Sequence, residues 1–484
     1  MTLSYIPSDT NDEGILKAAA SGSLPNGKPV IVNADGTVSV VAETNISQAI
    51  GTPVAVSGAS STNWFAAAFD PVSNKVVLAY LQGNHLKAVV GTISGTSISF
   101  GTAVNADESC QPTYISAAFD SNSNKVVIAY NAAQNTAQGL AIVGTVNGTS
   151  ISFGTPVQFD NTVQFTSTTF DSTSNKIVIA YMDDLNSDYG TAIVGTVSGT
   201  SISFGTATVF EAAFTQEIAA AFDSNSGKVV IAYRDRGNSF YGTAIVGTVS
   251  GTSISFGTAV VFYSGTNSYN AITFDSSSNK VVIAWQAGSN SNYGTAIVGT
   301  VSGTSITFGS SATFESAKVQ YVASTFDSNA NKVVISYRDD GNSNYGTLVV
   351  GTVSGTSISF GTAVVYETDT SAMRTSVFDS VSNKVFVGYK DDGNSQTTGV
   401  VFQNASTDTN LTSENYIGMS TGGTYASGST ATVKIIGNTS NEQTSLTAGQ
   451  AYYVQTDGTI GTTAADPSVF AGTAISATKL LVKT

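Results

Sequence analysis

Short apolar runs of strand length alternate with polar, glycine-containing gaps along most of the chain, and this pattern repeats. In every repeat a Phe-Asp pair closes one run, and a polar stretch, a lysine and a second apolar run ending in an aromatic residue follow. Seven such units, about 50 residues long, indicate a repeat architecture. The pairs begin at Phe69, Phe119, Phe170, Phe222, Phe274, Phe326 and Phe378, and the closing aromatics are Tyr80, Tyr130, Tyr181, Tyr233, Trp285, Tyr337 and Tyr389.

Each unit contains four runs with strand character, which we name A to D. In the unit 326–366, run A leads into Phe-Asp, B is KVVISY, C is TLVVGTV and D is SISFGTAVVY. Val, Ile, Thr and Tyr dominate the runs, whereas Ser, Asn, Asp and Gly dominate the gaps. The pattern predicts an all-β fold, a seven-bladed β-propeller with four antiparallel strands per blade. An open β-solenoid is the alternative.

The two ends of the repeat region distinguish these folds. The seventh unit stops after its C run, 399–403, and has no D run, whereas a matching segment, 46–56, precedes the first unit. We therefore expect an N-terminal strand to close the last blade. A closed ring gains the missing ladder bonds in this way, and a solenoid has no use for the strand.

The two chain ends resemble each other and not the repeats. Residues 24–38, LPNGKPVIVNADGTV, align without gaps on 446–460, LTAGQAYYVQTDGTI. Each segment predicts a β-hairpin around its Asp-Gly turn, at Asp35-Gly36 and Asp457-Gly458. We expect residues 1–44 and 408–484 to form the two halves of a small β anchoring module, with the propeller, 45–407, inserted between them.

The loops of a propeller lie on two faces. The A-to-B and C-to-D turns share the uniform face, where the seven copies are nearly identical, and each Asp of Phe-Asp is expected to accept hydrogen bonds from turn amides. A calcium loop would need a ligand two residues after the Asp, and Val72 and Val381 cannot supply one. The B-to-C and D-to-A connections share the variable face, where a ligand is expected. The alternative is that these loop sequences vary because this face binds nothing.

Five residues before each Phe lies a position that is aromatic in five of the seven units. Near the ring axis these aromatics could stack on the faces of sugars, or they could simply pack at the start of an inner strand. The candidates for a ligand face here are Trp64, Tyr114, Tyr269 and Tyr321.

Acidic and basic residues gather in the B-to-C loops. Carboxylate pairs can hydrolyse glycosides, but Asp-Asp-Gly-Asn is also an ordinary turn sequence. Arg234 and Arg338 occupy matching positions in non-adjacent blades, which is poor geometry for an arginine cluster that clamps one carboxylate. Further ligand-face candidates are Asp183, Asp184, Arg234, Asp235, Arg338, Asp339, Asp340, Asp391 and Asp392, and no catalytic residue is predicted.

Composition and charge argue against several classes of function. Lys plus Arg is 19 and Asp plus Glu is 33, so the net charge is −14, which argues against nucleic-acid binding and against docking on anionic lipid. No apolar run is long enough for insertion into a membrane. A single Cys and a single His disfavour a disulfide framework and a multi-histidine metal site, so neither cofactor nor metal is expected.

The hairpins, together with the near-identical blades, resemble virion structural proteins of marine tailed phages, especially tail-fibre and appendage proteins. The resemblance implies a virion component assembled in a bacterial host. The module would dock onto other virion proteins, and the variable face would bind a host-surface glycan or outer-membrane protein, as an adhesin. A homo-oligomer is possible. The alternatives are a capsid or tail decoration protein without a specific ligand, and a glycan-processing hydrolase of propeller fold.

Overall fold

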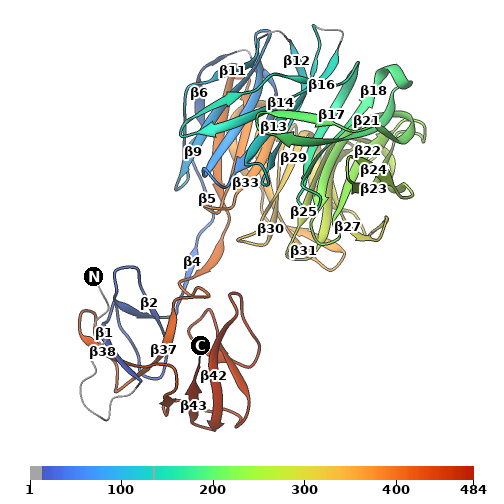
Figure 1. Ribbon diagram of the computed structural model, residues 1–484. Helices are drawn as coiled ribbons and strands as arrows, with labels where there is room; N and C mark the ends of the chain where they lie inside the picture. The colour runs from blue at the N-terminus through green and yellow to red at the C-terminus, as the bar shows by residue number, and fades with distance from the viewer. Residues whose placement is uncertain (1–13, 61, 109, 135–136, 484) are drawn as a thin grey trace. The chain divides into compact units, whose positions relative to one another are not determined.

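The computed structural model describes residues 14–60, 62–108, 110–134 and 137–483. Two compact units divide the chain: Ser47–Asn404 forms one, and Met1–Ile46 together with Ala405–Thr484 forms the other. Almost all regular structure in the described part is β-strand, and one short 3-10 turn, η1 (Asp184–Asn186), is the exception (Figure 1).

The first unit is a closed β-propeller, and seven blades can be counted among its described strands. Blade one consists of β7 (Thr62–Asp70), β8 (Lys75–Gln82), β9 (His85–Ser94), β10 (Ser97–Phe100) and β11 (Val104–Asp107). Blade two consists of β12 (Pro112–Asp120), β13 (Lys125–Ala132), β14 (Gln138–Asn147), β15 (Ser150–Phe153) and β16 (Val157–Asp160). Blade three consists of β17 (Val163–Asp171), β18 (Lys176–Asp183), β19 (Tyr189–Ser198) and β20 (Ser201–Phe204). Blade four consists of β21 (Thr208–Asp223), β22 (Lys228–Asp235), β23 (Tyr241–Ser250) and β24 (Ser253–Phe256). Blade five consists of β25 (Val260–Asp275), β26 (Lys280–Ala287), β27 (Tyr293–Ser302) and β28 (Ser305–Phe308). Blade six consists of β29 (Ala312–Asp327), β30 (Lys332–Asp339), β31 (Tyr345–Ser354) and β32 (Ser357–Phe360). The last is β33 (Val364–Asp379), β34 (Lys384–Asp391) and β35 (Gln396–Gln403), with β5 (Ala49–Ile50) and β6 (Val54–Ser60).

In the later blades the D-to-A connections are continuous strands, whereas the sequence suggests loops. Strands β21, β25, β29 and β33 each run without a break from the outer edge of one blade to the inner edge of the next. In β25, for example, Val260–Tyr263 pairs with β23 and Ala271–Asp275 pairs with β26. The inner strands contact their neighbours in order, and β33 contacts β7, so the ring is closed.

The N-terminal strand closes blade seven, as the sequence predicts. Ile50 pairs with Phe402, and Val54 pairs with Gly399. The amide of Gly51 also donates to the Val401 carbonyl at 2.8 Å. The fourth strand of the last blade therefore comes from the other end of the repeat region.

The turns of the uniform face are confirmed as hydrogen-bonded Asp turns. In all seven blades the Asp Oδ1 accepts the amides two and three residues later, as Asp120 does from Asn122 at 2.9 Å and Ser123 at 3.1 Å. Val72 and Val381 fit because only their amides take part. The Asp side chains are thus used by the fold.

Buried tyrosines link neighbouring blades. In five blades the closing Tyr of strand B donates its hydroxyl to a carboxylate on the outer strand of the preceding blade, as Tyr389 does to Glu367 at 2.8 Å. Burial raises the pKa of Tyr389, so the phenol stays protonated as the donor. The other pairs are Tyr130–Asp107, Tyr181–Asp160, Tyr233–Glu211 and Tyr337–Glu315.

The second unit contains two five-stranded sheets of the same topology. The sheet order β1-β38-β37-β2-β3 matches β39-β43-β42-β40-β41 strand for strand. The first sheet consists of β1 (Ile15–Ala19), β2 (Pro29–Val32), β3 (Val38–Val40), β37 (Tyr416–Thr421) and β38 (Thr430–Lys434). The second consists of β39 (Thr439–Ser440), β40 (Ala451–Val454), β41 (Ile460–Gly461), β42 (Val469–Ser476) and β43 (Lys479–Val482).

The match extends to single hydrogen bonds. Asp35 Oδ1 accepts the Thr37 amide at 3.0 Å and hydroxyl at 2.6 Å, and Asp457 does the same with Thr459 at 2.9 and 2.6 Å. A bulged glycine occupies the same place in both sheets, Gly418 at φ +149° and Gly472 at φ +154°. The structure refines the picture of two half-modules. The unit is a duplicated domain, and the propeller lies between β3 and β37 of the first duplicate.

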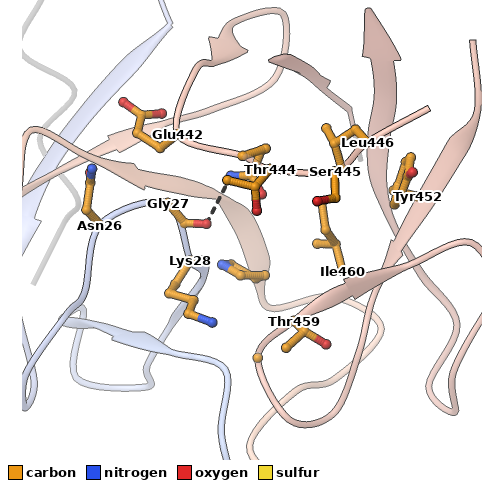
Figure 2. Close-up of a pocket in the computed structure, with 13 residues that line it drawn as sticks. Asn26, Gly27, Lys28, Glu442, Thr444, Ser445, Leu446, Tyr452, Thr459 and Ile460 are labelled. Atoms are coloured by element: carbon orange, nitrogen blue, oxygen red, sulfur yellow. Dashed lines mark hydrogen bonds between the residues drawn. The ribbon is translucent and has the colours of Figure 1, made fainter. Parts of the chain in front are cut away.

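We call the first duplicate, 14–46 with 405–435, the split domain, and the second, 436–483, the continuous domain. A polar cavity of about 400 Å³ lies between them, lined by Asn26–Pro29 from one and by Glu442–Leu446 from the other (Figure 2). Within it, Gln443 donates to the Gly27 carbonyl at 3.0 Å, the dashed line in Figure 2.

The duplicated unit is expected to fold without the propeller. Strands β4 (Glu43–Ile46) and β36 (Ser406–Thr409) pair antiparallel, and Ile46 lies opposite Ser406. An Asn-Gly turn joining these two residues would complete a hairpin. We expect this shortened chain to melt cooperatively by circular dichroism. A molten, non-cooperative product would mean that the propeller is needed to hold the split domain together.

Candidate functional site

Seven side chains stand at the same position of the seven inner strands, near the variable face. All seven residues have left-handed backbone, with φ between +39° and +54°, and none is glycine; they are Trp64, Tyr114, Phe165, Glu217, Tyr269, Tyr321 and Met373. The ladder register shifts at each of them, as between Thr113 and Ser116, so each lies in a β-bulge. Left-handed backbone costs an L-residue roughly 1–2 kcal/mol. We call this set the bulge ring.

The bulge turns the side chains toward those of the neighbouring blades. Trp64 and Tyr114 have ring centroids 4.5 Å apart, and Tyr114 and Phe165 are 4.7 Å apart. Tyr269 and Tyr321 form a second arc at 5.2 Å. All five aromatics are only partly buried, so aromatic surface remains accessible.

Beneath the bulge ring, residues of all seven inner strands line a cavity of about 370 Å³. Its lining begins one or two residues after each ring position and includes small side chains such as Ala66, Ser116, Ala219 and Ala323. Arg374 is the one charged residue in this lining, and its Nε and Nη1 have no hydrogen-bond partner among the described residues. The bulge ring therefore marks the variable-face end of a lined central channel.

Glu217 interrupts the aromatic ring and organises a polar cluster. Its Oε2 accepts the Tyr269 amide at 2.8 Å, and its Oε1 lies 3.8 Å from Arg234 Nη2. Arg234 also donates to Gln216 Oε1 at 2.5 Å and to Ser268 Oγ at 2.9 Å. Burial raises the pKa of Glu217, and the charge of Arg234 acts in the opposite direction.

Removing the arginine charge should raise the pKa of Glu217 further. In Arg234→Met the cation that stabilises the carboxylate is lost, whereas burial, which disfavours it, remains. A carbon-detected NMR titration would show Glu217 deprotonating at higher pH than in the wild type. Arg236→Met is the control, because Arg236 stacks on Phe214 at 4.0 Å instead. An unchanged Glu217 titration in Arg234→Met would contradict the assigned pair.

A second polar cluster surrounds Asp340. Its Oδ1 accepts Arg338 Nε at 2.7 Å, and its Oδ2 lies 2.9 Å from Lys318 Nζ and accepts Gln320 Nε2 at 2.9 Å. Burial acts to raise the pKa of Asp340, but the bonds from Arg338 and Lys318 outweigh it, and the pKa lies below its ordinary value. Arg338 also lies over the Tyr321 ring at 5.1 Å. This cluster thus joins a B-to-C loop to the bulge ring.

The acidic candidates divide into two groups. The first Asp of each loop belongs to the turn, because Asp183, Asp235, Asp339 and Asp391 accept amides two or three residues later. Burial raises the pKa of all four. These four carboxylates are therefore already engaged by their own loops.

The second Asp, present in three of these loops, pairs with a side chain and not with the amides of its own turn. Asp184 Oδ2 accepts Gln164 Nε2 at 2.9 Å, and Gln164 Oε1 accepts the Tyr114 hydroxyl at 3.1 Å. Asp184 Oδ1 has no hydrogen-bond partner among the described residues. Asp392 pairs with Lys390 at 3.0 Å. Asp184 and Asp340 therefore connect to the bulge ring through Gln164 and Arg338.

The structure brings residues that are far apart in the sequence into one region, and some of these residues were not among the candidates predicted from the sequence. Trp64, Tyr114, Tyr269 and Tyr321 do come together with Arg234, Arg338, Asp184 and Asp340. The residues missed are Phe165, Gln164, Gln216, Glu217, Lys318 and Gln320. Glu217 carried a signal, since it is the acidic residue at an otherwise apolar repeat position.

Within the described ranges, no group of three or more His, Cys, Asp or Glu side chains is arranged to hold a metal ion. Over the same ranges, no helix is long and apolar enough to cross a membrane.

Comparison with known proteins shows the fold. No protein-family model matches the chain, and no curated protein matches it. Among solved structures, a lectin from Burkholderia pseudomallei is similar, with a TM-score of 0.54 and 9% identity, covering 73% of this chain and 98% of the lectin. The Swd1 β-propeller domain from Myceliophteria thermophila has a TM-score of 0.47 and 8% identity, covering 74% of this chain and 99% of that domain. The chain is an all-β propeller protein.

Proposed function

We propose that the protein binds carbohydrate at the mouth of its central channel, and that it does so as an appendage protein of a tailed-phage virion. The observation that carries the binding proposal is the bulge ring. Seven strained residues recur at one position, and strain of this kind clusters at ligand-binding sites. Five of the seven present partly exposed aromatic rings around the channel mouth.

The chemistry of the mouth suits a sugar. Aromatic faces pack against the C–H face of a pyranose, and nearby amide, carboxylate and guanidinium groups can bond to its hydroxyls. The similar Burkholderia protein is named a lectin, which favours a glycan over another small molecule.

The ring variants should separate this site from the rest of the variable face. We expect the full-length chain to bind a defined group of glycans on an array, and Trp64→Ala/Tyr114→Ala to weaken that binding about tenfold, because two stacking contacts are lost and each contributes roughly 0.5–1.5 kcal/mol. Phe240→Ala is the matched control. Phe240 is an aromatic 39% exposed in a B-to-C loop, outside the bulge ring. Equal losses in both variants would contradict the site.

The virion role rests on the resemblance of the repeats and hairpins to tail-fibre and appendage proteins. Many weakly binding copies on one particle would hold a host cell through avidity. Immunogold labelling of purified virions, with an antibody against this chain, should mark an external appendage. Labelling absent from intact particles, with the chain found only free in the lysate, would overturn the role.

A further inference from the structure

The duplicated unit shows how one of its domains binds another. Sheet positions correspond one to one, so each face of the split domain has a counterpart on the continuous domain. We call the sheet face that carries Val30 and Val433 in the split domain the inner face, and the opposite one the outer face. The outer face of the split domain carries Ile31, Tyr416 and Met419, and the corresponding residues of the continuous domain are Tyr453, Phe470 and Thr473.

The two domains pack head to tail. Ile31, Tyr416 and Met419 are 1%, 6% and 0% exposed, and they share a core with inner-face residues of the continuous domain such as Val454 and Leu480. The Tyr416 hydroxyl also contacts the Ala471 carbonyl at 3.4 Å. The outer face of one domain therefore covers the inner face of the other, which is a heterologous contact.

This packing leaves one face of each domain uncovered by the other. On the outer face of the continuous domain, Tyr453 and Phe470 form a ring pair 5.7 Å apart and are only partly buried. On the inner face of the split domain, Ile417 and Ile435 are also partly buried, whereas their counterparts Ala471 and Val482 are fully buried. The rest of that inner face is already closed by the domain's own core, because Val30 and Val433 are 0% exposed and pack with Leu24, so Ile417 and Ile435 are the residues left for a partner.

We propose that a second copy of this chain docks here. The Tyr453–Phe470 face of one chain binds at Ile417 and Ile435 of the next, on the face equivalent to the one that is covered within the chain. The proposal does not depend on carbohydrate binding. In a head-to-tail contact each bound chain still has one free binding face, so the chains form rings or open rows.

The full-length chain should give assemblies at multiples of 49.5 kDa in light scattering, growing with concentration. Phe470→Glu and Ile417→Glu should each remove assemblies beyond the monomer, and Tyr453→Glu repeats the first test if Phe470→Glu melts early. Leu185→Glu is the control, because Leu185 is 71% exposed and lies in the propeller. Thermal melting establishes that each variant is folded.

Mixing the two variants tests whether the contact between chains is head to tail or face to face. Phe470→Glu keeps one working face and Ile417→Glu keeps the other, so an equal mixture should form dimers and stop there. A wild-type chain that stays monomeric at all concentrations overturns the proposal. So does association that survives both substitutions, or that is lost in Phe470→Glu but unaffected in Ile417→Glu, which would indicate a face-to-face contact instead.

Discussion

Gly205→Ala is expected to destabilise the propeller by roughly 1–3 kcal/mol, the usual range for forced overpacking. A Cβ at Gly205 would lie 1.9 Å from the Thr252 carbonyl oxygen in the C-to-D turn of the next blade. That oxygen belongs to the backbone, so the blades must move apart to make room. The same contact recurs at Gly51, Gly101, Gly154, Gly257 and Gly309, each within 2.0 Å of a Thr carbonyl.

Gly361→Ala is the matched control within the same repeat. Gly361 occupies the equivalent position next to blade seven, where the chain leaves the propeller and has no C-to-D turn. Its added Cβ would meet only the Val350 carbonyl, at 3.8 Å. Urea unfolding should place Gly205→Ala well below the wild type and Gly361→Ala close to it. Equal midpoints for the two variants would show that blade spacing is not set by this contact.

Deleting residues 1–57 is expected to abolish cooperative unfolding of the propeller. The deletion removes β5 and most of the pairing segment of β6, so β35 becomes an open edge. Ile50 packs beside Phe402 and Val56 beside Val401, and both partners are now fully buried. Exposing such side chains costs about 1.5–3 kcal/mol each.

The control deletion is residues 1–40, which removes β1 to β3 of the split domain but keeps β5 and β6. Calorimetry should show a propeller transition for this variant and none for the longer deletion. A normal propeller transition in the chain lacking residues 1–57 would refute closure by the N-terminal strand.

Much of this fold can be predicted from sequence because each blade repeats its local chemistry. Alternation marks the strands, and the Asp of Phe-Asp fixes a turn whose hydrogen bonds span only three residues. The missing D run of the seventh unit and its match at 46–56 predict the closure. The Asp-Gly turns likewise predict both terminal hairpins.

Other features depend on contacts that no local pattern records. Nothing in the residue type of Trp64 or Tyr114 indicates left-handed backbone, since aromatic side chains disfavour it. Two neighbouring acids, Asp339 and Asp340, look equivalent in sequence, yet one caps its own turn and the other pairs with Arg338 and Lys318. The duplication of the terminal domain is hidden because outside the hairpins the matching strands share few residues.

The most direct test of carbohydrate binding at the bulge ring uses the two tryptophans of the chain. Trp285 is fully buried in a blade, so Trp285→Phe leaves Trp64 in the bulge ring as the sole indole reporter. Titrating this variant with a glycan that binds on the array should change the Trp64 emission saturably, with the same midpoint as binding. A glycan that binds with full affinity and leaves the Trp64 emission unchanged would place the site elsewhere and contradict the account.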